Sequence, residues 1–197
     1  IPASLISVVG AYQFDEWFDL GTPALSREEF CRRFWLESRN LFLFYIGSSS
    51  ITGDSIEAVK EIYRTLSDSN DPLLKRMAIV VRPPLNSARE FGTVESERIA
   101  VVPKTFDGLS HAEGRQLLFD CVYHSTAVVV LHTTGVIDAL AKGKPSIVVL
   151  RESQRKVQNA EHFAQLLQSG AVESVKTPEE LRSAILRIIE GADICKQ

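Results

Sequence analysis

The stretch that decides the fold is Leu131–Pro145, which reads LHTTGVIDALAKGKP. An apolar run, Ala127–Leu131, leads into its small polar turn, Thr133–Gly135, and a short helical segment follows the turn. A second apolar run, Ser146–Leu150, begins as soon as that segment ends. Two apolar runs joined through a helix are typical of neighbouring parallel strands with a right-handed crossover. The stretch therefore predicts an α/β fold with a parallel sheet.

The same turn predicts an anion-binding site. The first N–H groups of a helix lack partners within it, and the helix dipole favours negative charge at that end. Thr133 and Thr134 add short hydroxyl groups, and Gly135 allows a ligand to approach the backbone closely. Asp138, in the first helical turn, is placed to accept hydrogen bonds from the hydroxyls of a ribose. We expect the phosphates and ribose of a nucleotide here; the alternative is an ordinary helix cap with a well-placed acid.

Further apolar runs predict the rest of the sheet. They alternate with amphipathic or polar segments, as expected of parallel strands joined by helices. One helix start is clear, because Thr177, Pro178 and Glu180 supply an N-cap, a first-position proline and an acid in the first turn. Asn86–Glu97, in contrast, reads as a polar and irregular excursion. We therefore expect a doubly wound, Rossmann-like α/β domain with a parallel sheet of about six strands. The expected strands are Leu41–Ile46, Ala78–Val81, Ile99–Val102, Ala127–Leu131, Ser146–Leu150 and Val172–Val175.

The N-terminal part of the chain does not follow this alternation. Ile6–Val9 reads as a short strand, and Ser26 with Glu29 forms a capping box for a following helix. We expect residues 1–40 to form an edge or junction segment that packs on a Rossmann-like domain of residues 41–197. The chain starts with Ile1 rather than Met and has no signal-peptide pattern, so we expect a fragment whose upstream part is missing.

Composition narrows the function classes. The 197 residues carry a net charge of −3, and the Lys and Arg residues are scattered, which argues against binding to nucleic acid or anionic lipid. Three cysteines, Cys31, Cys121 and Cys195, lie far apart, which argues against a disulfide framework or a zinc site. No acidic pair has metal-ligand spacing, and no apolar run is long enough to span a bilayer. We therefore expect one globular domain without a metal centre, in a reducing, cytoplasmic compartment.

Other candidate ligand groups follow the ends of neighbouring strands, the edge at which doubly wound sheets bind ligands. The turn Gly47–Ser49 lets a ligand approach the backbone closely and provides hydroxyl groups. Arg82 provides a permanent, forked positive charge for a phosphate, and Val102 and Pro103 can form one side of a pocket for a base. A histidine beside the Thr pair can hydrogen-bond a phosphate or sugar, or donate a proton. A plain turn, a surface ion pair and a packed side chain are alternatives. The candidates are Gly47, Ser48 and Ser49 after the first strand, Arg82 after the second, Val102 and Pro103 after the third, and His132 after the fourth, with Gln158 and Asn159 for a donor sugar.

Several common nucleotide and hydrolase motifs are absent from the sequence. The turn after the first strand reads GSSS, which lacks the lysine of a P-loop and the glycine fingerprint of a dinucleotide-binding domain. No serine lies in a nucleophile-elbow pattern. These absences argue against a P-loop NTPase, an NAD-dependent dehydrogenase and an α/β-hydrolase.

The segment LHTTGVIDALAKGKPSIVVL resembles the nucleotide-binding element of GT-B glycosyltransferases. In that element a Ser/Thr-rich turn and a glycine precede an acid, an alanine and a leucine, and Gly-Lys-Pro and a strand follow. Three other segments are similar to the opening, the first turn and the closing elements of the C-terminal half of such enzymes: SVVGAYQFDEWF, FYIGSSS and QNAEHFAQLLQSGAVESVKTPEELRSAILRII. Many members carry Glu where this chain has Asp138.

The resemblance implies a fold and a function. It implies two facing Rossmann-like domains, of which this chain is the C-terminal one, with a nucleotide-diphosphate sugar as donor substrate and no other cofactor. The missing N-terminal domain would supply the acceptor pocket and, in inverting members, the catalytic base. We therefore expect a nucleotide-sugar-binding domain of a glycosyltransferase that is inactive in isolation. Its expected location is the cytoplasm, or a membrane periphery reached through the missing part.

Three other functions fit the same residues. Nucleotide-sugar 2-epimerases and glycerophosphotransferases have a layout similar to that of GT-B glycosyltransferases. The resemblance therefore indicates the class of ligand more strongly than the reaction. A non-catalytic α/β binding module would keep the fold without any activity.

Overall fold

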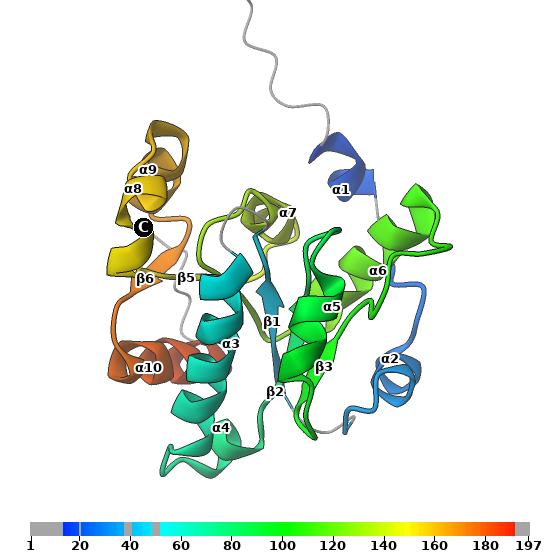
Figure 1. Cartoon of the computed structure of the whole chain (residues 1–197), viewed down its shortest axis with the longest axis horizontal. Helices are drawn as coiled ribbons and strands as arrows, with labels where there is room; N and C mark the ends of the chain where they lie inside the picture. The colour runs from blue at the N-terminus through cyan, green and yellow to red at the C-terminus, as the bar shows by residue number, and fades with distance from the viewer. Residues whose placement is uncertain (1–13, 20, 38–40, 49–51, 192–197) are drawn as a thin grey trace, which may run out of the picture.

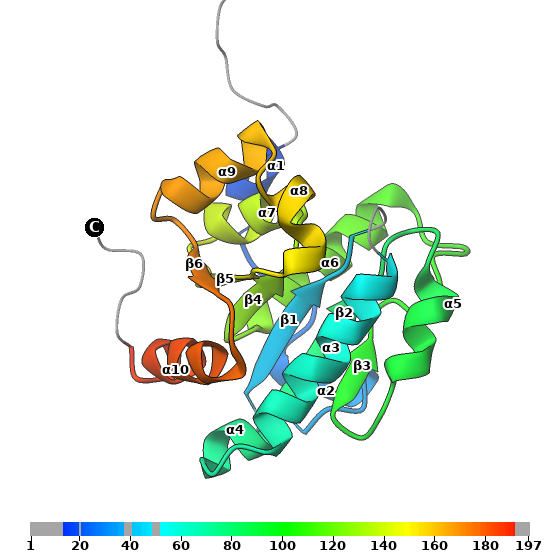
Figure 2. The same ribbon diagram turned by 60° about the vertical axis from the view of Figure 1, so that its left-hand side comes forward.

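The structure, a computed structural model, describes residues 14–19, 21–37, 41–48 and 52–191 of the chain. Six strands form one sheet in which every neighbouring pair is parallel, as predicted from the apolar runs. The strands are β1 (Phe42–Ile46), β2 (Ala78–Arg82), β3 (Ile99–Val101), β4 (Ala127–Val130), β5 (Ser146–Val149) and β6 (Glu173–Val175). Their order is β3-β2-β1-β4-β5-β6, the arrangement of a doubly wound, Rossmann-like domain. Figure 1 labels these strands except β4, and Figure 2 labels all six. The predicted fold class is confirmed, whereas the strand expected at Ile6–Val9 lies outside the described residues.

Helices cover both faces of the sheet (Figure 2). One face is covered by α3 (Thr52–Ser67), α4 (Pro72–Arg76), α5 (Ala88–Phe91) with η4 (Gly92–Val94), and α10 (Pro178–Ile189). The other is covered by α1 (Asp15–Asp19), α2 (Arg27–Arg33), α6 (His111–His124), α7 (Gly135–Ala141) and α9 (Glu161–Gln168). The connection between β5 and α9 contains η5 (Glu152–Gln154) and α8 (Arg155–Gln158). Because helices cover both faces, the central strands β1 and β4 are buried along their whole length, which explains their continuous apolar runs.

The described part of the N-terminal segment packs on the α6 face. Trp17 of α1 and Phe30 of α2 are buried in the same apolar cluster as the inward side of α6. The backbone N–H groups of Ala24 and Leu25 donate hydrogen bonds of 2.9 and 3.2 Å to the buried carboxylate of Asp120. These two bonds tie the chain between α1 and α2 to α6.

The segment expected to be an irregular excursion is ordered and partly buried. Within Asn86–Glu97 the chain forms α5 and η4, and the side chains of Phe91 and Val94 lie in the core against α3 and the sheet. The prediction was wrong because the segment is polar on average, whereas two apolar residues three positions apart are enough to anchor one short helical face.

The strand order creates a point where connections diverge. From β1 the chain continues outward through β2 to β3, while β4, on the other side of β1, leads outward to β5 and β6. The connection after β1 enters α3 on one face, and the connection after β4 enters α7 on the other. The carboxyl ends of β1 and β4 therefore flank the place where open α/β sheets bind ligands.

Gly47, directly after β1, is required by packing. A Cβ atom there would lie 2.9 Å from Phe91 Cζ, 3.0 Å from Pro84 Cδ and 3.1 Å from the carbonyl oxygen of Arg82. The Gly47 N–H group also donates a 2.9 Å hydrogen bond to that carbonyl. The turn after β1 is thus pressed against the loop after β2, and only glycine fits between them.

We expect Gly47→Ala to lower the free energy of unfolding by about 1–3 kcal/mol, because the added methyl group overpacks this contact. Gly53→Ala is the matched control, since a Cβ atom at Gly53 meets nothing within 4 Å. Urea unfolding of both variants and the parent chain checks the prediction. A Gly47→Ala midpoint equal to that of the parent would contradict it.

Candidate functional site

The turn after β4 is held against the end of β1. In the sheet, Ile46 pairs with Val130, so the last residues of the two strands lie side by side. A Cβ atom on Gly135 would lie 3.2 and 3.4 Å from the side-chain carbons Cγ2 and Cδ1 of Ile46. Glycine at this position therefore lets α7 begin directly beside the end of β1, which brings the predicted Thr-Thr-Gly turn to the point where the connections diverge.

The hydrogen bonding of this turn differs from the sequence-based expectation. The Gly135 N–H group donates to Thr133 Oγ1 at 3.3 Å, and the Val136 N–H group donates to the Thr133 carbonyl at 3.4 Å. The Ile137 N–H group donates to the Thr134 carbonyl at 2.9 Å. The expectation of free N–H groups was wrong for these three, because the turn satisfies them itself. The first two bonds are long, and a phosphate oxygen that replaced Thr133 Oγ1 would be a stronger, charged acceptor.

Thr134 and Asp138 leave polar groups of this turn available. Thr134 is exposed, and its hydroxyl makes no capping hydrogen bond to α7. Asp138 is half-buried, and burial raises the pKa of its carboxyl to about 7. Burial is the only cause of this shift, so the described residues supply no hydrogen bond or cation that acts against it. An acid that is stabilised by a helix dipole has a lowered pKa, whereas burial raises the pKa of Asp138.

The turn after β1 lies beside the first turn of α3, which carries the carboxylate of Asp54. The Ser48 N–H group lies 3.5 Å from Ser55 Oγ in the first turn of α3, and Ser49 lies outside the described residues. Asp54, in the same turn of α3, accepts hydrogen bonds from Ser153 Oγ at 2.9 Å and from the side chain of Gln154. These bonds hold the pKa of Asp54 below its usual value. The carboxylate of Asp54 thus lies in the first turn of α3, as the carboxyl of Asp138 lies in the first turn of α7.

His132 and Gln158, two of the predicted ligand groups, are used by the fold. The His132 ring is half-buried and packs on Phe163 of α9, with 4.7 Å between the ring centroids. The buried Gln158 amide donates to the carbonyls of Leu131 and Val149, both at 2.9 Å, and accepts from the Arg151 N–H group at 3.1 Å. The Gln158 side chain therefore joins the ends of β4 and β5 through hydrogen bonds, and the expectation that it reaches a sugar was wrong.

The predicted residues after β2 and β3 lie along the same edge of the sheet. Val102 is fully buried, and its N–H group donates to the Val81 carbonyl at 2.8 Å; Pro103 is buried beside it. Arg82 is half-buried, and its Nη2 donates to the Gly114 carbonyl at 3.3 Å. Its guanidinium carbon also lies 5.0 Å from the centre of the Phe106 ring. Sequence reasoning missed Phe106 and α6 as neighbours of Arg82, because no pattern links positions so far apart in the chain.

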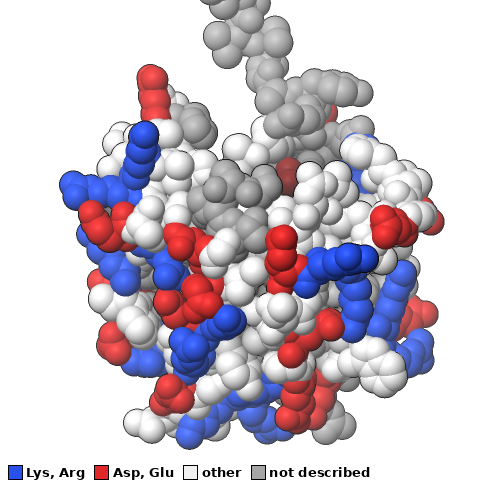
Figure 3. All heavy atoms as spheres, in the orientation of Figure 1, with Lys and Arg blue, Asp and Glu red and all other residues white. Residues whose placement is uncertain are grey.

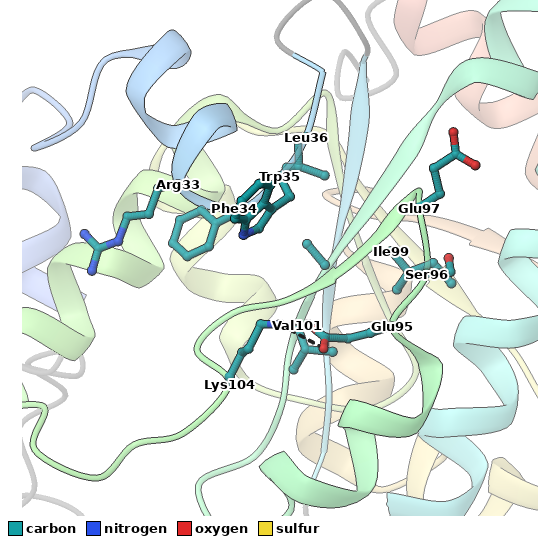
Figure 4. Close-up of a pocket in the computed structure, with 11 residues that line it drawn as sticks. Arg33, Phe34, Trp35, Leu36, Glu95, Ser96, Glu97, Ile99, Val101 and Lys104 are labelled. Atoms are coloured by element: carbon teal, nitrogen blue, oxygen red, sulfur yellow. Dashed lines mark hydrogen bonds and ion pairs between the residues drawn. The ribbon is translucent and has the colours of Figure 1, made fainter.

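Among the cavities that the described residues form, three involve the loops or the edge strand on the β2–β3 side of the sheet. One of about 600 Å³ lies where the end of α2 meets the edge strand β3, and Figure 4 shows Lys104 and Glu95 paired at its rim, with 3.0 Å between nitrogen and oxygen. One of about 490 Å³ is lined by Arg82 and the start of α6. One of about 630 Å³ lies between the loops after β2 and β3. Thr133–Asp138 lines none of these three.

Charge is mixed over the face seen in Figure 3, where Lys and Arg lie among Asp and Glu. Within the described residues, no three or more His, Cys, Asp and Glu side chains are grouped so that they could hold a metal ion. None of the helices in the described part of the chain is long and apolar enough to cross a membrane.

Comparison with known proteins gives a fold-level relation. No protein-family model and no curated protein sequence matches this chain. Among solved structures, the chain is similar to "Trehalose-6-phosphate synthase. OtsA" with a TM-score of 0.53 and 13% sequence identity. The match covers 93% of this chain and 46% of that one, so the chain spans about half the length of its structural neighbour. At this identity the likeness shows the fold alone, which is GT-B-like.

We expect Asp138 to make stability depend on pH. Because its pKa of about 7 in the folded chain lies above its ordinary value, the unfolded chain ionises first. Stability is therefore lost as the pH rises from about 4 to 7. Asp138→Asn removes this loss. At pH 8 its free energy of unfolding should exceed that of the parent by roughly 1–3 kcal/mol, a range that allows for screening of the partly exposed charge.

Asp68→Asn, which changes an exposed aspartate at the end of α3, is the matched control for that measurement. Urea unfolding of the parent and both variants at pH 5 and pH 8 checks the sign. A stability difference between Asp138→Asn and the parent that is the same at both pH values would contradict the account.

Proposed function

We propose that this chain is the nucleotide-sugar-binding half of a glycosyltransferase-like protein. The GT-B-like fold and the coverage of about half of a glycosyltransferase's length support this proposal. The observation that carries it is the half-buried Asp138 carboxyl, which lacks a hydrogen bond from the described residues and lies beside the Thr-Thr-Gly turn. A titratable group with a strongly shifted pKa at the ligand-binding edge of an α/β sheet is a candidate functional residue.

The proposed binding mode assigns a task to each group of the turn. The hydroxyls of Thr133 and Thr134 and the Gly135 N–H group contact the diphosphate. Asp138 accepts hydrogen bonds from the ribose hydroxyls, which supplies the donors that its charged form lacks in the free protein. The surrounding candidates at the ends of the strands are Gly47, Ser48, Ser49, Val102, Pro103 and His132. Arg82 lines a separate cavity beside α6.

The chain's own contribution to sugar transfer is then positioning and electrostatics. Donors fixed before the reaction stabilise the negative charge that develops on a leaving diphosphate without reorganising. The acceptor pocket and any catalytic base belong, in this proposal, to a second domain upstream of the chain. We therefore expect the isolated chain to bind a nucleotide sugar and to transfer no sugar.

Isothermal titration calorimetry with UDP-glucose, GDP-glucose and ADP-glucose tests the proposal. These ligands have no group that titrates near pH 7, so a pH dependence reports on the protein. The nucleotide sugar that binds should bind about tenfold more tightly at pH 8 than at pH 6, because only the charged form of Asp138 accepts both hydroxyls. Asp138→Asn should weaken binding at pH 8 by about 10–100-fold and remove most of the pH dependence.

Asp68→Asn again serves as the control and should bind as the parent does. Two results would refute the proposal. One is a folded parent chain that binds none of the three ligands, and the other is an Asp138→Asn variant with the affinity of the parent at both pH values.

A further inference from the structure

The cavity beside Arg82 has the make-up of a separate ligand site. It has a volume of about 490 Å³, within the range of small-molecule pockets. Its wall is mostly apolar, with Leu85, Phe106, Leu109 and Leu118 contributed by the loops after β2 and β3 and by α6. Two arginines, Arg82 and Arg115, line it as well, and no Asp or Glu is among its lining residues.

Arg82 enters this cavity with an incomplete set of hydrogen bonds. Its Nη2 donates to the Gly114 carbonyl at 3.3 Å, and the guanidinium lies over the Phe106 ring. Its Nη1 is buried and has no acceptor among the residues that the structure describes. A buried donor of a charged group without an acceptor destabilises the free protein, and a ligand oxygen would recover this loss.

The other polar groups of the wall are already engaged. Arg115 Nη2 lies 2.7 Å from His111 Nδ1, and both residues line the cavity. The start of α6 is closed by a capping box, in which Ser110 Oγ accepts from the Glu113 N–H group and the Glu113 carboxylate accepts from the Ser110 N–H group. The start of the helix therefore offers little to a ligand, and Arg82 is the group that an anion would meet.

We propose that this cavity binds an organic acid with an apolar body. A carboxylate, sulfonate or phosphate oxygen accepts from the Arg82 guanidinium, which turns so that Nη1 reaches the cavity, and the apolar part of the ligand lies against Leu109 and Leu118. A diphosphate with a sugar and a ribose would leave that apolar wall without a partner. This site is distinct from the nucleotide site at Thr133–Asp138, and it stands or falls separately from the proposed function.

The probe is 8-anilinonaphthalene-1-sulfonate, which joins an anion to an apolar body and fluoresces when it leaves water. Its neutral counterpart is N-phenyl-1-naphthylamine, which lacks the sulfonate. We expect one sulfonate probe to bind per chain. Arg82→Gln should weaken this binding by about 10–100-fold, the scale of a lost charged hydrogen bond, and should change the affinity of the neutral probe less than twofold.

Two further variants make the test independent of the folding of Arg82→Gln. Leu85→Glu adds an acid at an exposed leucine of the cavity wall and should also weaken sulfonate binding, by charge repulsion. Arg33→Gln alters the apolar cavity at the end of α2 and should leave the affinity unchanged (Figure 4).

Three results would overturn the proposal. They are parent-like sulfonate binding by both Arg82→Gln and Leu85→Glu, loss of binding in Arg33→Gln, and displacement of the probe by UDP-glucose at concentrations that saturate the nucleotide site. The last result would assign the cavity to the nucleotide. Absence of binding of all three nucleotide sugars with normal probe binding would refute the proposed function and leave this inference intact.

Discussion

The close contact between Gly135 and Ile46 determines the geometry of the candidate site. Because no side chain separates α7 from the end of β1, the turn after β4 lies at the point where the connections of the sheet diverge. The Gln158 amide fixes the same edge from the other side, since it binds the carbonyls at the ends of β4 and β5. Small-residue packing and a buried amide thus hold the turn in place with little help from surface charge.

Two ionisable side chains at this edge have incomplete hydrogen bonding within the described part of the chain. The Asp138 carboxyl is half-buried without a donor from the described residues, and Arg82 Nη1 is buried without an acceptor from them. Both conditions lower the stability of the free protein. Natural proteins break local rules of this kind chiefly at functional sites, which is why the two proposals rest on these residues.

Most of the sheet was predictable from the sequence because the inner strands carry continuous apolar runs that both helical layers cover, whereas the edge strand β6 reads ESV. The capping residues of α2 and α10 were predictable for the same kind of local reason. The core role of Phe91 was not, because its neighbours in the sequence are polar and its partners lie on other elements. Gln158 was also misjudged, since its acceptor Leu131 is 27 residues away. Local patterns predict elements, whereas such long-range contacts depend on how the elements pack.

The most direct test of the account is to map a bound nucleotide sugar onto the fold. Backbone amide chemical shifts of the 197-residue chain can be followed by NMR during titration with UDP-glucose, or with whichever nucleotide sugar binds. The account predicts that the largest shifts occur at Thr133–Asp138 and at Ser48, and that Arg33–Leu36 at the far edge stays unchanged. Saturable shifts that spare Thr133–Asp138 and fall elsewhere would contradict it.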